Sequence, residues 1–210
     1  VQVEFVSANP TGPLHVGHGR GAALGDAIAN LLEAVGYGVE REYYINDAGS
    51  QMRLLGESVW ARHLEAKGKP VQFPENGYHG EYVRELAERV SAVVPGLADA
   101  EAEQAIPACA TQASRILLGE IEADLRAFGV VFDSWVAARR LYDSGEVEAA
   151  LATLRAGGYL YEEGKAIGFR ASDFGDEKDR ILIRSSGEPT YFTSDIAYHA
   201  NKIRRGFHRL

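Results

Sequence analysis

The sequence has little of what several large classes of protein depend on. Its one cysteine, Cys109, excludes an intramolecular disulfide framework and a zinc site with several cysteine ligands, and it favours a reducing compartment. There is no signal peptide and no apolar run long enough to span a bilayer, so we expect a cytoplasmic protein without a membrane partner. The formal net charge of -8 argues against binding nucleic acid through bulk positive charge, although a local basic cluster could still bind RNA.

Apolar residues, by contrast, are plentiful. They make up 46% of the 210 residues, enough for a sizeable core in one or two domains. The sequence has no initiator methionine at its start, Val1 opens within an alternating stretch, and the last residues follow a helical pattern directly. We therefore expect a fragment of a longer protein.

The first 45 residues predict a βαβ unit. Apolar and polar residues alternate over 1–6 and again over 39–45, which is typical of strands. Between them, residues 22–35 place leucine, isoleucine and valine at helical spacing on one face. A strand, a helix and a second strand in this order favour a parallel sheet, in which ligands bind beyond the carboxyl ends of the strands.

The remaining pattern predicts an α/β protein with a Rossmann-like, doubly wound parallel sheet and a mainly helical insertion. We expect residues 1–46 to form the first half of the sheet domain, residues 47–129 the helical insertion, and residues 130–210 the second part, truncated at its C-terminal end. In that last part a strand is expected over 190–193, followed by a final helix that begins at Ser194 or Asp195.

The loop between the first strand and the first helix carries the clearest chemistry. Two prolines and Gly12 keep it out of regular structure, and His15 and His18 flank Gly17 at the expected mouth of the helix. A helix N-terminus offers free N–H groups and the positive end of a dipole, which suits the phosphates of a nucleotide. The alternative interpretation is a pair of exposed loop histidines without a ligand.

Five blocks of sequence, in order from the start to the end of the chain, resemble the bacterial arginyl-tRNA synthetases, a family of class I aminoacyl-tRNA synthetases. The first block contains the first nucleotide-binding motif of that class. The blocks are Val3–His18, Glu42–Gly49, Tyr78–Tyr82, Asp173–Arg180 and Gly187–His199.

The resemblance implies ATP-dependent activation of arginine and its transfer to the acceptor end of tRNA(Arg). It assigns His15 and His18 as catalytic groups that donate hydrogen bonds to phosphate oxygens as charge develops. The residues expected to bind ATP are Pro10, His15, Gly17, His18 and Gly19. Mg²⁺ would travel with the ATP phosphates, and we expect no metal site built from protein ligands.

The arginine substrate needs a carboxylate opposite its guanidinium, which Asp195 is expected to supply beside the phenol of Tyr191. The residues that the resemblance assigns to arginine are Glu4, Ser7, Asn9, His18, Tyr191 and Asp195. Taken singly, Asp195 is more typical of a helix N-cap and Tyr191 of a packed strand aromatic. The full-length protein is expected to be a monomer.

Two other functions remain open at this stage: a different adenylyltransferase that uses the same histidine pair, and a non-catalytic module that binds a small molecule or RNA. Residues 17–22 fit a dinucleotide-binding pattern, but a ten-residue loop separates them from their strand. Asp173–Gly175 resembles a kinase metal motif without the other kinase motifs. Because the second ATP motif is missing, we expect the 210 residues alone to bind ligands at best; robust arginylation of tRNA by them would contradict this.

Overall fold

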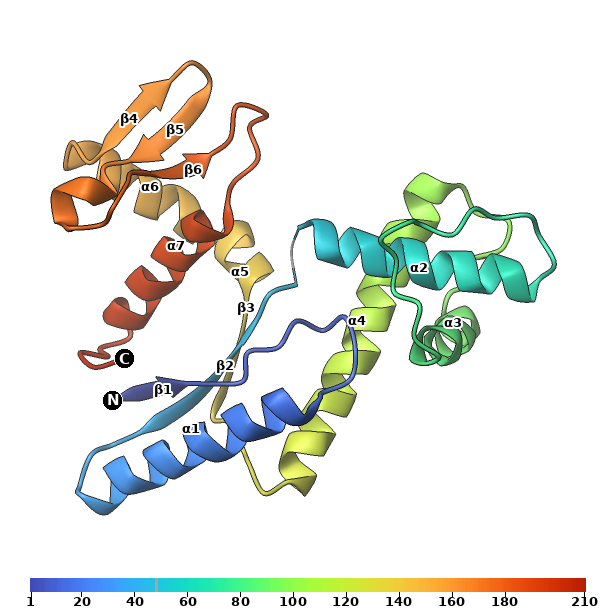
Figure 1. Cartoon of the computed structure of the whole chain (residues 1–210), viewed down its shortest axis with the longest axis horizontal. Coiled ribbons are helices and arrows are strands. Elements are labelled where there is room, and N and C mark those ends of the chain that lie inside the picture. Colours follow the sequence, from blue (N-terminus) through green and yellow to red (C-terminus); the bar gives the residue numbers. More distant parts are fainter. Residues whose placement is uncertain (48) are drawn as a thin grey trace. The chain divides into compact units, whose positions relative to one another are not determined.

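The structure is a computed structural model that describes residues 1–47 and 49–210; Ala48, which falls in one of the five blocks, lies outside the described residues. Figure 1 shows the elements in chain order. They are β1 (Gln2–Glu4), α1 (Val16–Ala34), β2 (Glu40–Ile45), α2 (Ser50–Ala66), α3 (Tyr82–Val93), α4 (Ala102–Ala127), β3 (Ser134–Ala137), α5 (Ala138–Asp143), α6 (Glu146–Ala156), β4 (Leu160–Glu163), β5 (Ala166–Phe169), the 3-10 helix η1 (Ala171–Phe174), β6 (Arg180–Ile183) and α7 (Tyr191–Arg204).

The chain divides into two compact units, and each is described by itself. Residues 3–135 form one unit, and residues 1–2 together with 136–210 form the other. The division into parts 1–46, 47–129 and 130–210 stays a prediction. None of the helices in the described ranges, 1–47 and 49–210, has the length and apolar character needed to cross a membrane.

A parallel three-stranded sheet in the order β1-β2-β3 confirms the mixed α/β class. Helix α1 connects the first two strands and contacts the sheet through small residues: Ala22, Gly25 and Ala29 are buried. Gly25 lies directly against the ring of Phe5, so close that a Cβ on Gly25 would be 2.1 Å from Phe5 Cγ. The leucine and isoleucine side chains that revealed this helix in the sequence, such as Leu24 and Leu31, are exposed.

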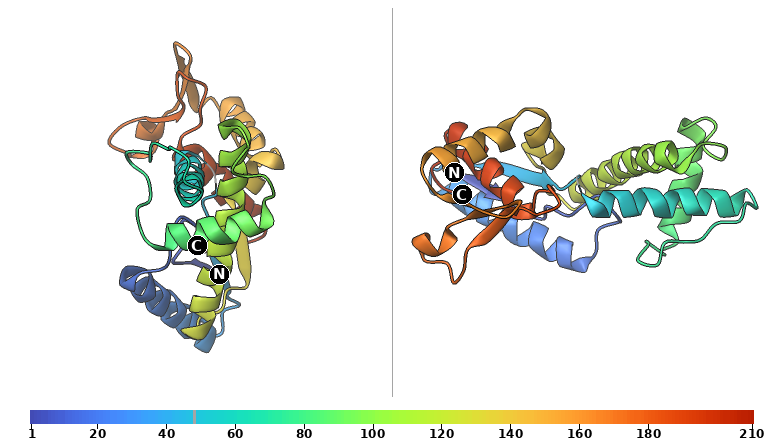
Figure 2. Two further views of the ribbon diagram at one scale, coloured as in Figure 1. Left: turned by 90° about the vertical axis from the view of Figure 1, so that its right-hand side faces the viewer. Right: turned by 90° about the horizontal axis from the view of Figure 1, so that it is seen from above.

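Helices α2, α3 and α4 form a helical layer with its own core. Leu55 and Val59 of α2 pack with Leu86 of α3 and with Cys109 and Leu117 of α4, and all five side chains are buried. Figure 2 shows α2 and α4 running beside each other over much of their length. The regular spacing of the apolar residues in α2 and α3, and in α4 after residue 116, is what predicted the helices from the sequence.

Helix α4 is longer than the sequence pattern predicted. The apolar periodicity indicated a helix over 116–128, whereas α4 begins at Ala102 and includes Pro107. Proline has no N–H to donate and usually ends or kinks a helix, so a helix that runs through Pro107 is unexpected from the sequence. Burial of Ala105 and Cys109 in the core of the helical layer accompanies the earlier start.

The second unit contains the antiparallel sheet β4-β5-β6, in which Leu160 pairs with Phe169 and Glu163 with Ala166. The sequence predicts this hairpin from two strand-like runs, 159–161 and 166–170, on either side of Glu163 and Gly164, and the observed pairing confirms it. The predicted strand over 190–193 is wrong, because α7 already begins at Tyr191. The hydroxyls of Thr190 and Thr193 donate to the Ile181 and Leu182 carbonyls of β6, at 2.7 and 2.6 Å, and so fix the start of α7 beside that strand.

Candidate functional site

A strained turn opens the loop that follows β1. Val6 and Ser7 both have positive φ angles, 65° and 41°, and the Ser7 N–H donates to the Phe5 carbonyl at 2.9 Å. Positive φ is unusual for any side-chain-bearing residue and is a marked outlier for β-branched valine. Such a conformation stores about 1–3 kcal/mol per residue and concentrates at binding and active sites, because the surrounding structure must enforce it.

The turn brings together two of the residues assigned to arginine, Glu4 and Ser7. The Ser7 hydroxyl donates to Glu4 Oε1 at 3.0 Å and accepts from the N–H of Tyr44 on β2 at 3.1 Å. The hydroxyl is therefore oriented by two neighbours, and the Glu4 carboxylate lies at the same edge of the sheet. Both side chains can present acceptor oxygens to a cationic group.

Two tyrosine hydroxyls hold the main chain of the next loop residues. Tyr43 of β2 donates to the Ala8 carbonyl at 2.9 Å, and Tyr82 of α3 donates to the Thr11 carbonyl at 2.8 Å. Burial raises the pKa of both phenols above the ordinary value, so both remain protonated donors at neutral pH. Gly12 packs against Tyr82, whose hydroxyl would lie 3.2 Å from a Cβ on this glycine.

The sequence reasoning gave Tyr43 and Tyr82 no role. Their partners lie 35 and 71 residues away along the chain, and no local pattern predicts such a bond. The one available signal was that each tyrosine falls in a block that resembles the family.

His15 and His18 are positioned by the start of α1 itself. The helix begins at Val16, six residues before the predicted start, so His15 is the N-cap and His18 lies in the first turn. The Gly17 N–H donates to His15 Nδ1 at 3.1 Å, and the His15 N–H donates to His18 Nδ1 at 3.2 Å. The two rings stack with their centroids 3.7 Å apart. The predicted neighbourhood of the two histidines is present, with His18 inside the helix.

This arrangement determines which ring nitrogens face solvent as donors. Because both Nδ1 atoms accept a main-chain N–H, each neutral ring carries its proton on Nε2. Partial burial and the neighbouring His15 lower the pKa of His18 below its ordinary value, which favours the neutral ring at pH 7. Two Nε2–H groups at the N-terminus of a 19-residue helix form a donor set suited to an anion.

The other residues assigned to ATP are Gly17 and Gly19, which flank His18 in the chain, and Pro10 in the preceding loop. A Cβ on Gly17 would lie 2.9 Å from His15 Cε1, so the absence of a side chain there allows the imidazole to fold back onto the helix. Gly19 follows in the first turns of α1 with open space where a Cβ would point. Pro10 is buried in the loop.

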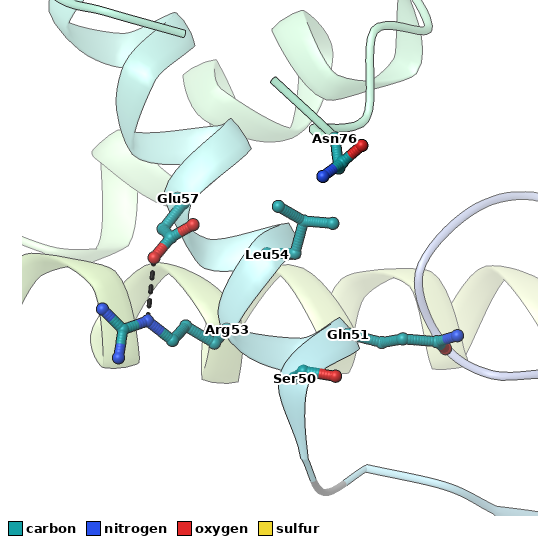
Figure 3. Close-up of a pocket in the computed structure, with 6 residues that line it drawn as sticks. All are labelled: Ser50, Gln51, Arg53, Leu54, Glu57 and Asn76. Carbon is teal, nitrogen blue, oxygen red and sulfur yellow. Dashed lines mark hydrogen bonds and ion pairs between the residues drawn. The ribbon is translucent and has the colours of Figure 1, made fainter. Parts of the chain in front are cut away.

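Asn9 contacts the helical layer. Its Nδ2 donates to Oε1 of Gln51, the second residue of α2, at 2.5 Å. Gln51 also lines a cavity of about 290 Å³ together with Ser50, Arg53, Leu54, Glu57 and Asn76 (Figure 3). Arg53 pairs with Glu57 at 2.8 Å and extends to the opposite side of α2 from Gln51.

Tyr191 and Asp195 lie one turn apart on the exposed face of α7, in the second unit. The alternatives considered for each of them are wrong: Thr190 is the N-cap of this helix, and Tyr191 is helical and 55% exposed. His199 continues the same face, and its Nδ1 donates to the Asp195 carbonyl at 2.9 Å, since a carbonyl can only accept. The side chains of Asn201 and Arg204 on α7 both donate hydrogen bonds to the Glu146 carboxylate of α6.

Two acidic residues that follow η1, Asp176 and Asp179, accept hydrogen bonds from nearby side chains. Asp176 accepts two hydrogen bonds from Arg180, at 2.7 and 2.8 Å, and Asp179 accepts from the hydroxyl of Ser172 at 2.6 Å. These bonds lower the pKa of both carboxyls. Among residues 1–47 and 49–210 no group of three histidine, cysteine or acidic side chains is placed to hold a metal ion.

Comparison with known proteins gives a consistent result. Residues 1–208 match the family described as tRNA synthetases class I (R), catalytic domain. The chain is 53% identical over 208 residues to an arginine–tRNA ligase of Syntrophotalea carbinolica and 51% identical over 211 residues to one of Desulfosudis oleivorans. The two alignments include 99% and 100% of this chain but only 38% of each relative, so the chain spans about two fifths of the relatives' length.

A solved structure agrees in fold. A crystal structure from Campylobacter jejuni, described as that of an arginyl-tRNA synthetase, superposes with a TM-score of 0.89 at 39% identity. The superposition includes 99% of this chain and 46% of the Campylobacter jejuni chain.

Proposed function

Because the chain belongs to the family of class I tRNA synthetase (R) catalytic domains, we propose that it is the nucleotide- and amino-acid-binding part of an arginine–tRNA ligase. The longer protein would activate arginine with ATP to arginyl-adenylate and transfer the arginyl group to the acceptor end of tRNA(Arg). The observation that supports this most directly is the stacked His15–His18 pair at the start of α1.

The activation step suits this donor set. An oxygen of the arginine carboxylate forms a bond to the α-phosphorus of ATP, the bond from that phosphorus to the bridging oxygen breaks, and pyrophosphate leaves. Negative charge grows on the phosphate oxygens, and two preoriented Nε2–H groups can stabilise it with little reorganisation. Mg²⁺ bound to the phosphates would neutralise further charge without a dedicated set of protein ligands.

Recognition of arginine divides between its two ends. A planar guanidinium pairs best with a carboxylate that accepts two parallel hydrogen bonds, and Asp195 offers one on an exposed helix face with Tyr191 beside it. At the other end, Glu4, Ser7 and Asn9 supply acceptor oxygens for the α-ammonium. His18, which the family resemblance assigns to both substrates, would donate to the arginine carboxylate as well as to the phosphate.

The finer features follow from the same proposal. Arginine, ATP and the acceptor end of tRNA(Arg) are the proposed partners, and a role in translation supports a cytoplasmic location for the protein. A monomeric full-length protein needs no second subunit to supply any of the residues named above.

The test is calorimetric binding of two non-hydrolysable sulfamoyl analogues of aminoacyl-adenylates, one arginyl and one leucyl. We expect the wild-type chain to prefer the arginyl analogue by at least about tenfold, since a charge-assisted pair contributes about 1.5–3 kcal/mol. Asp195→Asn should abolish this preference, whereas His18→Ala should weaken both analogues equally. Equal binding of both analogues by the wild type would instead indicate a different adenylyltransferase.

A further inference from the structure

The Asn9 carboxamide can present either of its ends to a ligand, and the two ends have opposite chemistry. The nitrogen end donates two hydrogen bonds, and the oxygen end only accepts. An ammonium group carries three donors and no acceptor, so it can bind only the oxygen end. An Asn9 side chain that rotates freely would meet an ammonium with the wrong end part of the time.

In the structure Gln51 engages one of these two ends. Its Oε1 accepts the Asn9 Nδ2–H at 2.5 Å, which ties the nitrogen end of Asn9 to α2 and leaves Oδ1 as the end that faces away. The two residues are 42 positions apart in sequence. Their contact therefore depends on the fold and not on local chain geometry.

The backbone at Gln51 is fixed by the packing of its helix. It lies in the first turn of α2, a 17-residue helix whose Leu55 and Val59 are fully buried against α4. A group supported by a packed helix is held more accurately than one supported by a loop. In Figure 3 its side chain projects from α2 on the side opposite to Arg53, so the Arg53–Glu57 ion pair does not compete for it.

We propose that Gln51 is a positioning residue of the amino-acid site: it orients Asn9 so that Oδ1 accepts a hydrogen bond from the α-ammonium of the substrate. This inference rests on the proposed function, because it takes arginine as the ligand. No site residue was predicted in the helical layer from its sequence. The proposal gives this layer a part in recognising the α-ammonium group. The bond is solvent-exposed, which limits its effect, since water competes for both partners.

The experiment compares two ligands on the 210-residue chain: arginine and 5-guanidinopentanoate, which is arginine without its α-amino group. Gln51→Met removes the acceptor and keeps an unbranched side chain of similar length. We expect it to lower the affinity for arginine about fivefold, as for the loss of one exposed hydrogen bond between neutral groups, and to leave the affinity for 5-guanidinopentanoate unchanged. Gln51→Glu retains an acceptor and should keep the wild-type ratio of the two affinities or exceed it.

Tyr82→Phe is the matched control. It also removes a hydrogen bond between the helical layer and this loop, to the Thr11 carbonyl, but it does not touch the Asn9 carboxamide. A general loosening of the loop should therefore change both affinities by the same factor in Tyr82→Phe. If Gln51→Met behaves in this way too, Gln51 is only structural and the inference is overturned.

A second measurement does not need a ligand. The side-chain NH₂ signals of Asn9 in a ¹H–¹⁵N spectrum, assigned by their loss in Asn9→Ala, should shift in Gln51→Met and stay in place in Tyr82→Phe. Signals that stay in place in Gln51→Met overturn the positioning role whatever the ligands do. A wild-type chain in which these signals respond as expected but which discriminates no arginyl ligand overturns the proposed function, and the assignment of the ammonium with it.

Discussion

Substituting Gly17 by alanine should separate nucleotide binding from stability. A Cβ at this position would lie 2.9 Å from His15 Cε1 and 3.1 Å from His15 Nδ1, both closer than the 3.4–4 Å of an ordinary contact. The ring has to swing away, which breaks its hydrogen bond from the Gly17 N–H and its stacking on His18. The Nε2–H groups of both histidines then lose their common orientation.

The two effects on stability nearly cancel. Losing an N-cap bond destabilises a helix by about 1 kcal/mol, and replacing glycine by alanine within a helix stabilises it by up to about 1 kcal/mol. We expect a net change within about 1 kcal/mol, which moves the Tm of a chain of this size by about 2–4 °C at most. Affinity for ATP should fall at least about tenfold, because hydrogen bonds to a charged group contribute about 1.5–3 kcal/mol each.

Calorimetric titration with ATP and a thermal melt of the same samples measure both quantities. Gly21→Ala is the control: it lies in the same helix, has nothing within 4 Å of its added methyl, and belongs to no assigned site. It should raise the Tm slightly and leave ATP affinity within about twofold of the wild type. Wild-type ATP affinity in Gly17→Ala, or an equal loss in Gly21→Ala, would refute the role given to the folded-back imidazole.

Three further outcomes can be measured on the same protein. Gly25→Ala should destabilise the chain by about 2 kcal/mol or more in chemical denaturation despite the better helix propensity of alanine, because the methyl would overlap the ring of Phe5; an unchanged midpoint would contradict this. Burial raises the pKa of Cys109 to about 12, so a thiol reagent should label it only at the rate at which the chain opens, and labelling as fast as that of a free thiol would be inconsistent with the buried site. Burial lowers the pKa of His18 and His63 in the folded chain, so as the pH falls the unfolded chain takes up these two protons first, at about pH 6.5. The free energy of unfolding should therefore be constant above that pH and fall as the pH drops below it. A flat profile between pH 7 and 5 would exclude this linkage.

The sequence predicted the elements whose residues repeat with a clear period. The α2 and α3 helices and the β4–β5 hairpin were recognisable because their apolar residues recur at helical spacing or alternate around a glycine turn. The first turn of α1 escaped this reasoning, because three glycines at 17, 19 and 21 have poor helix propensity. There the reciprocal cap between His15 and His18 starts the helix, and side-chain capping leaves no periodic signal.

The loop was identified as the centre of the site from its residue types, but its shape was not. Nothing in the order of residues 3–18 predicts the positive φ angles at Val6 and Ser7. The bonds that hold Ser7 and the residues after it come from β2, α2 and α3, which are between about 35 and 71 positions away. Residue roles in ATP and arginine binding stay predictions, whereas the contacts that would support them are features of the fold.

The misassigned strand at 190–193 shows why the type of element matters for chemistry and not only for topology. Tyr191 and Asp195 are four residues apart, a spacing that places two side chains on the same side of a strand and also on the same face of a helix. In a strand, however, they would be about 13 Å apart, at a rise of about 3.3 Å per residue. On one face of a helix the Cβ atoms of such a pair are about 5–6 Å apart. Only the helix that begins at Tyr191 allows a single guanidinium to contact the phenol and the carboxylate together.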